Sequence, residues 1–375
     1  FGPEVRVGTL SIARQQMVEI ARAQAFAADV VIFDEPTASL TDTEKAQLFA
    51  TIGGLKARGA GIVYISHKMD EIFEITDRIT VLRDGQVQGT VDTAATDVTA
   101  ITRMMIGRTL ESYFHRARST FGAEVLRVEG LTLPGLFEDV SLSVRAGEVV
   151  GLYGLVGAGR SEVVETLFGI RRGATGTLRW EGVEVALPTP RQATRMGMAL
   201  VPESRKEQGL VLGMGGSENI TLPHLDLFSR ARILDSARER EVFDRYRAAL
   251  DIKTTGPDQP VRTLSGGNQQ KFVLAKWLCA EPKLVILDEP TRGIDVGSKS
   301  AIHELIAGLA ERGLAVLVIS SEMPEVLGVS HRVLCMAEGR MVAEFAGSAM
   351  TEENLIDAVS HHVRPPAPAG PLAAQ

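Results

Sequence analysis

The stretch GLYGLVGAGRSEVVETLFG (151–169) places a glycine-rich segment between an apolar run and an amphipathic run. The apolar run is typical of a buried strand, and RSEVVETLFG carries apolar residues at helical spacing. From Gly154 it reads G-x-x-x-x-G-R-S, the pattern of a phosphate-binding loop with Arg160 in the place of lysine. The stretch therefore predicts a strand, a phosphate-binding loop and a helix, in that order.

This loop predicts a set of phosphate and metal contacts. Glycines permit backbone conformations in which successive N–H groups turn inward on phosphate oxygens at a helix N-terminus. The residues expected to contact phosphate are Gly154, Gly157, Ala158, Gly159 and Arg160. Ser161 follows at the position that ligates Mg²⁺. Arginine keeps the positive charge of lysine, but its wide planar group cannot act as a compact point charge inside the loop.

A second motif is the apolar run LVILDEP (284–290), which ends in Asp288 and Glu289. A buried strand that ends in two carboxylates is costly unless a cation or a proton donor lies there. Asp288 suits Mg²⁺ or a metal-bound water, and Glu289 suits polarising the water that attacks a γ-phosphate. A helix cap would explain one acid, but it does not explain two copies of Asp-Glu-Pro-Thr.

An internal repeat organises the chain. Three pairs of segments align: LSIARQQ (10–16) with LSGGNQQ (264–270), VVIFDEP (30–36) with LVILDEP (284–290), and IVYISH (62–67) with VLVISS (316–321). The offset is constant, because 264 − 10, 288 − 34 and 321 − 67 all equal 254. The chain is therefore predicted to be a tandem duplication.

The repeat also predicts the domain boundaries. The second copy begins near Glu124, and 124 − 254 = −130, so the first copy is expected to lack roughly its first 130 residues and its own phosphate loop. The predicted division is residues 1–90 for the C-terminal part of the first domain, 91–123 for a linker, 124–360 for a complete second domain and 361–375 for a disordered tail. Apolar runs that alternate with helical segments predict an α/β fold with a largely parallel sheet.

Composition narrows the function. A net charge of −7 argues against electrostatic capture by nucleic acid or anionic lipid. No apolar run reaches the roughly 20 residues that a membrane span needs. Cys279 and Cys335 lie in apolar surroundings without metal-like spacing, which favours buried thiols in a reducing compartment.

At this point a resemblance becomes specific. LSGGNQQ followed by LVILDEPTRGID resembles the nucleotide-binding subunit of an ABC transporter. LVPESRKEQGLVLGMGGSENITLP (200–223) and RMMIGRTLESYF (103–114) are similar to the tandem ATPase subunits of bacterial monosaccharide importers of the ribose, galactose and xylose type. The resemblance implies tandem ABC-type P-loop NTPase domains, the first incomplete, with a parallel-sheet core, an antiparallel β subdomain and a helical subdomain. Glu203 then stands where most ABC proteins have the glutamine of the Q-loop and is expected to contact ATP.

The resemblance implies two nucleotide sites, each between the phosphate loop of one half and the signature segment of the other. One site would use Asp34 for the metal, with Glu35 and His67 as catalytic residues. His67 stands at the family's switch histidine, in the motif order that follows Asp34, which favours this role over that of a buried core histidine. The signature residues of this site would be Ser265, Gly266, Gly267 and Gln269. This site is expected to hydrolyse ATP.

The parts of the other site are degraded. It would combine the phosphate loop and acidic pair of the second half, Gly154–Ser161, Asp288 and Glu289. Arg160 replaces lysine, and Ser321 replaces the histidine. The opposing signature segment has one serine and two residues that replace glycines, namely Ser11, Ile12 and Ala13. Losing one transition-state donor costs about 10²–10³ in rate, so this site is expected to bind nucleotide with little or no turnover.

The implied protein is an ATP- and Mg²⁺-dependent subunit, peripheral on the cytoplasmic face of a bacterial membrane, that drives a separate sugar permease. A periplasmic or extracellular sugar-binding protein would be an indirect partner, and no nucleic acid is expected. The 375-residue chain alone is expected to lack appreciable ATPase activity. Three alternatives stay open at this stage: a tandem ATPase for nucleosides or an autoinducer sugar, a soluble ABC protein acting on ribosomes, and a nucleotide-binding regulatory module.

Overall fold

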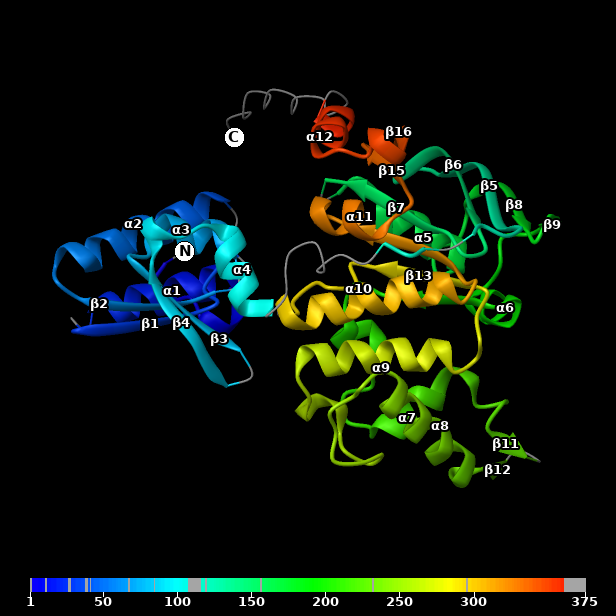
Figure 1. Cartoon of the computed structure of the whole chain (residues 1–375), viewed down its shortest axis with the longest axis horizontal. Coiled ribbons are helices and arrows are strands. Elements are labelled where there is room, and N and C mark those ends of the chain that lie inside the picture. Colours follow the sequence, from blue (N-terminus) through cyan, green and yellow to red (C-terminus); the bar gives the residue numbers. More distant parts are fainter. Residues whose placement is uncertain are drawn as a thin grey trace. The chain divides into compact units, whose positions relative to one another are not determined.

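The computed structural model describes residues 2–10, 12–25, 28–37, 40, 42–66, 68–83, 85–106, 116–118, 120–155, 157–230, 233–294 and 296–360. The chain divides into two compact units, Phe1–Leu110 and Glu111–Gln375. Each unit is described by itself (Figure 1). Ser11, His67 and the expected tail 361–375 lie outside the described residues.

The described residues of the first unit form two strand pairs and four α-helices. Strands β1 (Val30–Asp34) and β2 (Gly61–Ile65) pair in parallel, while β3 (Arg78–Arg83) and β4 (Gln86–Asp92) form an antiparallel pair. The helices are α1 (Ile12–Ala25), α2 (Asp42–Ala57), α3 (Met69–Ile75) and α4 (Val98–Ile106). The helical stretch expected within 91–123 is α4, and it packs on β3 through the buried Ile101. The first unit therefore includes this helix.

One face of the β1–β2 pair is covered and the other is open. Val31 and Phe33 pack against Leu48 and Ile52 of α2, whereas Val30 and Ile32 are 60% and 66% exposed. The counterparts of Val30 and Ile32 at an offset of 254 are Leu284 and Ile286, and both are fully buried in the second unit. The two units thus share a strand pattern but differ in what covers it.

The second unit is built on a six-stranded sheet in the order β10-β13-β14-β7-β15-β16. Its strands are β10 (Met198–Val201), β13 (Leu284–Asp288), β14 (Ala315–Ser320), β7 (Val149–Gly154), β15 (Arg332–Ala337) and β16 (Arg340–Ala346). The first five are parallel to their neighbours and β16 is antiparallel. Every residue of β7, β13 and β14 is buried, which explains why these strands read as continuous apolar runs. Helices α5 (Arg160–Phe168), α6 (Pro190–Met196), α10 (Val296–Glu311), α11 (Met323–Val329) and α12 (Glu352–Ser360) accompany this sheet.

Two smaller subdomains accompany the sheet. An antiparallel sheet in the order β6-β5-β8-β9 consists of β5 (Glu124–Leu133), β6 (Phe137–Arg145), β8 (Thr175–Trp180) and β9 (Val183–Val185). A helical part contains α7 (Gly216–Thr221), α8 (Ser236–Ala249) and α9 (Gly266–Leu278), with the short pair β11 (Ser229–Arg230) and β12 (Ile233–Leu234). Short turns of helix are η1 (Val7–Thr9), η2 (Thr93–Ala95), η4 (Arg205–Gly209), η5 (Leu222–His224), η6 (Val261–Thr263) and η7 (Gly347–Ala349). The predicted α/β class, with its antiparallel and helical subdomains, is confirmed.

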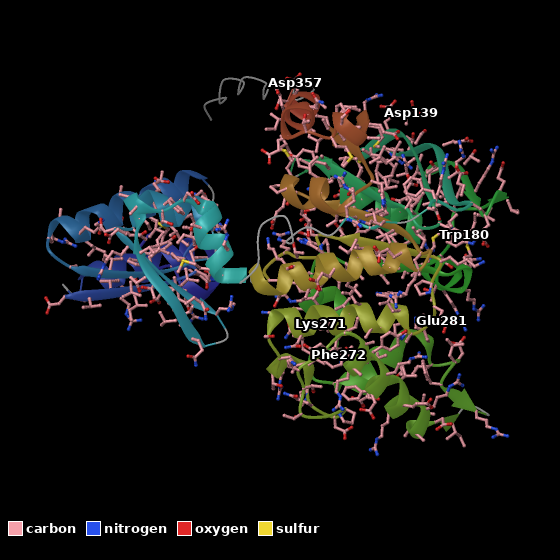
Figure 2. All side chains as sticks on the ribbon, in the orientation of Figure 1. Asp139, Trp180, Lys271, Phe272, Glu281 and Asp357 are labelled. Carbon is pink, nitrogen blue, oxygen red and sulfur yellow. The ribbon has the colours of Figure 1, made fainter. Side chains whose placement is uncertain are left out.

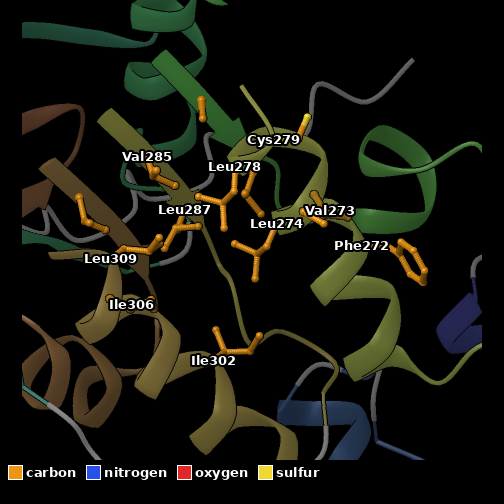
Figure 3. Close-up of a cluster of buried hydrophobic side chains, with 14 of the residues drawn as sticks. Phe272, Val273, Leu274, Leu278, Cys279, Val285, Leu287, Ile302, Ile306 and Leu309 are labelled. Atoms are coloured by element: carbon orange, nitrogen blue, oxygen red, sulfur yellow. The ribbon is translucent and has the colours of Figure 1, made fainter. Parts of the chain in front are cut away.

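Helix α9 connects the helical part to the central sheet. Figure 3 shows Leu274 and Leu278 of α9 in one apolar cluster with Leu287 of β13 and Ile306 of α10. The opposite side of α9 carries Phe272, fully buried and stacked on Phe243 of α8 at 6.1 Å between ring centroids. Helix α9 is therefore held on two sides, and this fixes the position of its N-terminus. Within the described parts of the chain, no helix is long and apolar enough to cross a bilayer.

Candidate nucleotide site

The predicted phosphate loop lies between β7 and α5, at the carboxyl end of a central strand. Gly157 and Gly159 have φ values of +86° and +93°, in the left-handed region that favours glycine. A Cβ on Gly154 would lie 2.4 Å from the carbonyl oxygen of Met336. Gly159 caps α5 without a side-chain hydrogen bond, so the first N–H groups of the helix are oriented for an anion. The sequence predicted this geometry.

Arg160, the first residue of α5, is folded into the loop. Its side chain is 8% exposed, and Nη2 lies 3.4 Å from Oε1 of Glu289. Nη1 is buried and has no hydrogen-bond partner among the described residues. Burial lowers the pKa of Arg160, while the carboxylates of Glu289 and Asp288 oppose that shift. The guanidinium therefore spans from the phosphate loop to the acidic pair and keeps one donor available for an anion.

The acidic pair lies at the end of β13. Glu289 has φ of 46°, donates its N–H to the Ile319 carbonyl at 2.9 Å and accepts the Ser321 N–H at Oε1 over 2.8 Å. Burial raises the pKa of Glu289. Burial also raises the pKa of Asp288 to about 6, against a hydrogen bond from Ser161 that lowers it.

Asp288 and Ser161 fit a divalent cation. Asp288 Oδ1 is buried and has no hydrogen-bond partner in the described part of the chain. Oxygen donors are the ligands that Mg²⁺ prefers, and Mg²⁺ commonly combines one or two protein ligands with substrate phosphates. No group of three or more histidine, cysteine or acidic side chains among the described residues could hold a metal by itself. The fit is thus to a metal that is bound together with phosphate.

The first unit repeats the backbone geometry of the acidic pair. Asp34 ends β1, and Glu35 has φ of 46° and donates its N–H to the Ile65 carbonyl at 2.9 Å. These values match those of Glu289 and Ile319 in the second unit. Asp34 is exposed, whereas Asp288 is 4% exposed.

The second predicted anion site is the N-terminus of α9. Ser265 caps the helix and accepts from the Asn268 N–H. A Cβ on Gly266 would lie 2.7 Å from Arg205 Nη2, and a Cβ on Gly267 would lie 2.6 Å from Ser298 Oγ. A larger residue at either position would therefore displace the Arg205 or Ser298 side chain. In the first unit, Ile12 and Ala13 open α1, and their side chains lie outside the described residues.

Gln269 and Glu203 have partners inside the second unit. Gln269 is 3% exposed and donates Nε2–H to the Val261 carbonyl at 3.1 Å. Glu203 forms an ion pair with Arg292, in the turn that follows the acidic pair. The structure gives both residues an internal partner in addition to the ATP contact expected for them.

Sequence reasoning missed Arg205, in η4. Its guanidinium donates to the carbonyls of Arg292 at 2.8 Å and Gly293 at 3.0 Å, and to Gln269 Oε1 at 3.4 Å. Lys276 of α9 also binds η4, because its ammonium donates to the Gly209 carbonyl at the end of η4. The segment VPESR had been recognised, but nothing in its pattern indicated which carbonyls its arginine would bind.

The side chains along α9 show why this helix is rigid at the site. Figure 2 labels Lys271 and Phe272, consecutive residues of α9. Phe272 is fully buried, and Lys271 donates to the Asp251 carbonyl at 2.9 Å. Contacts on both sides of α9 therefore fix the position of Ser265 at its N-terminus.

A phosphate loop after one parallel strand, an acidic pair after another and a glycine-opened helix define the ATPase of an ATP-binding cassette. The ABC transporter family profile matches residues 137–292. The chain is 49% identical over 358 residues to the "Ribose import ATP-binding protein RbsA" of Geobacillus kaustophilus, covering 96% of this chain and 72% of the relative. It is 46% identical over 356 residues to a "Putative ribose/galactose/methyl galactoside import ATP-binding protein 1" of Rhizobium etli, covering 95% and 68%. The chain therefore belongs to the family of ribose import ATP-binding proteins of ABC transporters, and the predicted family and ABC-type transport ATPase class are confirmed.

Solved structures support the fold. A nucleotide-free ATP-binding cassette from an ABC transporter aligns with a TM-score of 0.54 at 22% identity, covering 63% of this chain and 95% of that chain. A cassette in its ADP conformation aligns with a TM-score of 0.53 at 23% identity, covering 64% and 96%. Both comparisons concern the fold alone.

Proposed function

We propose that the chain is the ATP-hydrolysing, energy-coupling part of a sugar import system in which one nucleotide site is competent and the other is degenerate. The observation that carries the proposal is the ion pair between Arg160, inside the phosphate loop, and Glu289, the acid expected to polarise water. Names of relatives that specify ribose or galactose import support a monosaccharide as the transported substrate.

The Arg160–Glu289 pair explains how a site can bind nucleotide without hydrolysing it. Oε1 of Glu289 faces Arg160 Nη2 at 3.4 Å and the Ser321 N–H at 2.8 Å. Two donors therefore already bind this oxygen, and it is occupied where the attacking water would have to be oriented. Ser321 also lacks the imidazole that the family uses at this position. Each lost transition-state donor costs about 10²–10³ in rate, so the losses together leave a binding site.

The hydrolytic site, in this proposal, uses the acidic pair of the first half. Glu35 has the same backbone geometry as Glu289. Asp34 would hold Mg²⁺, His67 would contact the γ-phosphate, and the signature segment would be Ser265, Gly266 and Gly267. Bound ATP supplies the phosphoryl group and Mg²⁺ neutralises its charge, while the protein's residues orient water and donate hydrogen bonds.

The partners follow from this role. ATP-driven closure would act on an integral-membrane sugar permease, which in turn receives sugar from a periplasmic or extracellular binding protein. The subunit would lie on the cytoplasmic face of the membrane. Co-purification with a permease after expression from one operon would support this arrangement.

Substitution of the two glutamates in the complete transport assembly tests the proposal. Glu35→Gln should lower steady-state ATPase activity by about 100-fold or more, because the polarising carboxylate is lost. Glu289→Gln should leave the activity within about threefold of wild type. If Glu289→Gln abolished the activity and Glu35→Gln retained it in full, hydrolysis would belong to the second half and the proposal would be contradicted.

The same reasoning applies to the 375-residue chain alone. Its single predicted phosphate loop is the one that contains Arg160. Purified by itself, the chain should show no appreciable Mg²⁺-dependent ATPase activity above a matched Glu289→Gln control. Robust turnover that Glu289→Gln removes would contradict the assignment of this loop as degenerate.

A further inference from the structure

Both units bury a glutamate that the proposed function does not use. Glu71 in α3 is fully buried, and Glu325 in α11 is 2% exposed. The two positions are related by the repeat offset, since 325 − 71 = 254. A carboxylate inside a protein is costly unless several hydrogen bonds compensate the lost water. The hydrogen-bond partners of each carboxylate therefore show which segments it joins.

In the first unit, Glu71 binds three hydroxyl groups. Thr37 Oγ1 lies 2.7 Å from both carboxylate oxygens, Tyr64 OH lies 2.8 Å from Oε2, and Ser66 Oγ lies 3.4 Å from Oε2. The ammonium of Lys68 adds an ion pair at 3.3 Å. Tyr64 lies on β2, and the other partners lie in the segments that follow β1 and β2, so one carboxylate binds both segments.

The second unit repeats the arrangement around Glu325. Ser320 Oγ donates to Oε2 at 2.6 Å, the Thr291 hydroxyl also donates, and His303 Nε2 lies 2.9 Å from Oε1. The threonine and serine occupy repeat-equivalent positions, because 291 − 37 and 320 − 66 both equal 254. The third partner differs, since Tyr64 lies on β2 and His303 lies on α10.

The serine closes the arrangement in both units. Ser66 Oγ accepts the Lys68 N–H at 3.1 Å, and Ser320 Oγ accepts the Glu322 N–H at 3.0 Å. Each serine therefore fixes the turn after its strand while it donates to the buried carboxylate. In the second unit the next residue, Ser321, donates its N–H to Glu289 at 2.8 Å. The fastened turn thus reaches the acid of the nucleotide site directly.

We propose that Glu71 is a positioning residue for ATP hydrolysis. It holds Thr37, two residues after Glu35, and Ser66, one residue before His67, at a fixed separation. The carboxylate acts through these two segments and contacts neither ATP nor water at the reacting phosphate. This inference rests on the proposed function, in which Glu35 and His67 belong to the hydrolytic site.

Glu71→Gln, made in the complete transport assembly, is the primary test. Glutamine has the volume of glutamate, but its amide nitrogen cannot accept the hydroxyl protons that the carboxylate accepts. The kcat for ATP should fall about tenfold, because small displacements of catalytic groups have large effects on rate, and KM for ATP should change by less than about twofold. Glu325→Gln is the matched control: it disrupts the equivalent arrangement in the degenerate half and should leave kcat within about twofold.

A second pair of variants keeps the test informative if the glutamine variants do not fold. Thr37→Val and Thr291→Val each remove one buried hydroxyl at nearly constant volume, at positions that are 2% and 1% exposed. Thr37→Val should lower kcat severalfold and Thr291→Val should not, while both should lower the thermal midpoint of their own unit by similar amounts. Restoration of most of the activity by Thr37→Ser would support the hydroxyl contact itself.

The outcomes separate this inference from the proposed function. Equal effects of Glu71→Gln and Glu325→Gln on kcat, or no effect of Glu71→Gln, would show a purely structural carboxylate and overturn the inference. If Glu35→Gln and Glu289→Gln instead place hydrolysis in the second half, the proposed function is wrong. The positioning inference would then require the kcat loss to follow Glu325→Gln, and retention of kcat in that variant would overturn it.

Discussion

Replacing Arg160 with methionine removes the cation that links the phosphate loop to Glu289. The two side chains are 8% and 10% exposed, so the pair is buried. Removing one partner of a buried ion pair typically costs about 3–5 kcal/mol. The substitution also removes the buried Nη1, which has no partner among the described residues. An unpaired buried donor costs about 1–3 kcal/mol, so its removal offsets part of the loss. The difference is a net destabilisation of about 2 kcal/mol.

Thermal unfolding of the chain without nucleotide measures this effect. For a unit of this size, about 2 kcal/mol corresponds to a decrease of roughly 4–8 °C in the midpoint of the second unit's transition. The matched control is Arg171→Met, which removes the same side chain from a partly exposed pair with Glu165 at 2.6 Å. Exposed pairs contribute up to about 1 kcal/mol, so the control should change the midpoint much less. An Arg160→Met midpoint equal to or above that of wild type would refute the role of the pair.

Three other substitutions test the site and its support. Gly154→Ala should destabilise the second unit by about 1–3 kcal/mol, measured as a lower urea midpoint, because the new Cβ would lie 2.4 Å from the Met336 carbonyl oxygen; an unchanged midpoint would contradict this. Burial lowers the pKa of Lys276 from 10.5 to about 8. Burying the charged ammonium therefore destabilises the folded protein fully below pH 8, and this cost disappears toward pH 10.5. Wild type should therefore gain stability over Lys276→Met by at most about 3 kcal/mol across that range, followed by thermal unfolding, and a difference independent of pH would refute the assignment. Arg160→Lys should leave ATPase activity of the transport assembly within about twofold, because Ser321 still replaces the histidine; a rise that depends on Glu289 would show that the arginine alone silences this site.

The sequence predicted the parts of the site that depend on local pattern. Glycines at 154, 157 and 159 imply a strand, a tight loop and a helix, and the structure has β7, the loop and α5 in that order. The apolar run before Asp288 implies a buried strand, and all five residues of β13 are buried. These features depend on neighbours in the chain, so a short window of residues is enough to predict them.

Contacts between distant segments could not be predicted in the same way. Arg160 and Glu289 are 129 positions apart, and Arg205 reaches carbonyls 87 and 88 positions away. Carbonyl groups occur at every residue, so sequence gives no indication of which ones an arginine will bind. The repeat offset was the one long-range signal in the sequence, and it related Glu35 to Glu289 without showing that Glu289 faces Arg160. The surroundings of equivalent residues therefore had to come from the fold.

The two units share the backbone geometry of the acidic pair, and the buried glutamates explain why that geometry is costly to change. Glu35 and Glu289 share φ of 46° and an N–H bond of 2.9 Å to the end of the adjacent strand. Glu71 and Glu325 hold the segments that follow the strands, and their threonine partners Thr37 and Thr291 are buried with them. Changing one member of such a group leaves the others unsatisfied at about 1–3 kcal/mol each, so the arrangement is costly to alter one residue at a time. Arg160 belongs to a smaller group, since its ion pair within the described residues is the buried one with Glu289 at 3.4 Å. In the proposed function, turnover is therefore lost at the phosphate loop while the acidic pair keeps its backbone geometry.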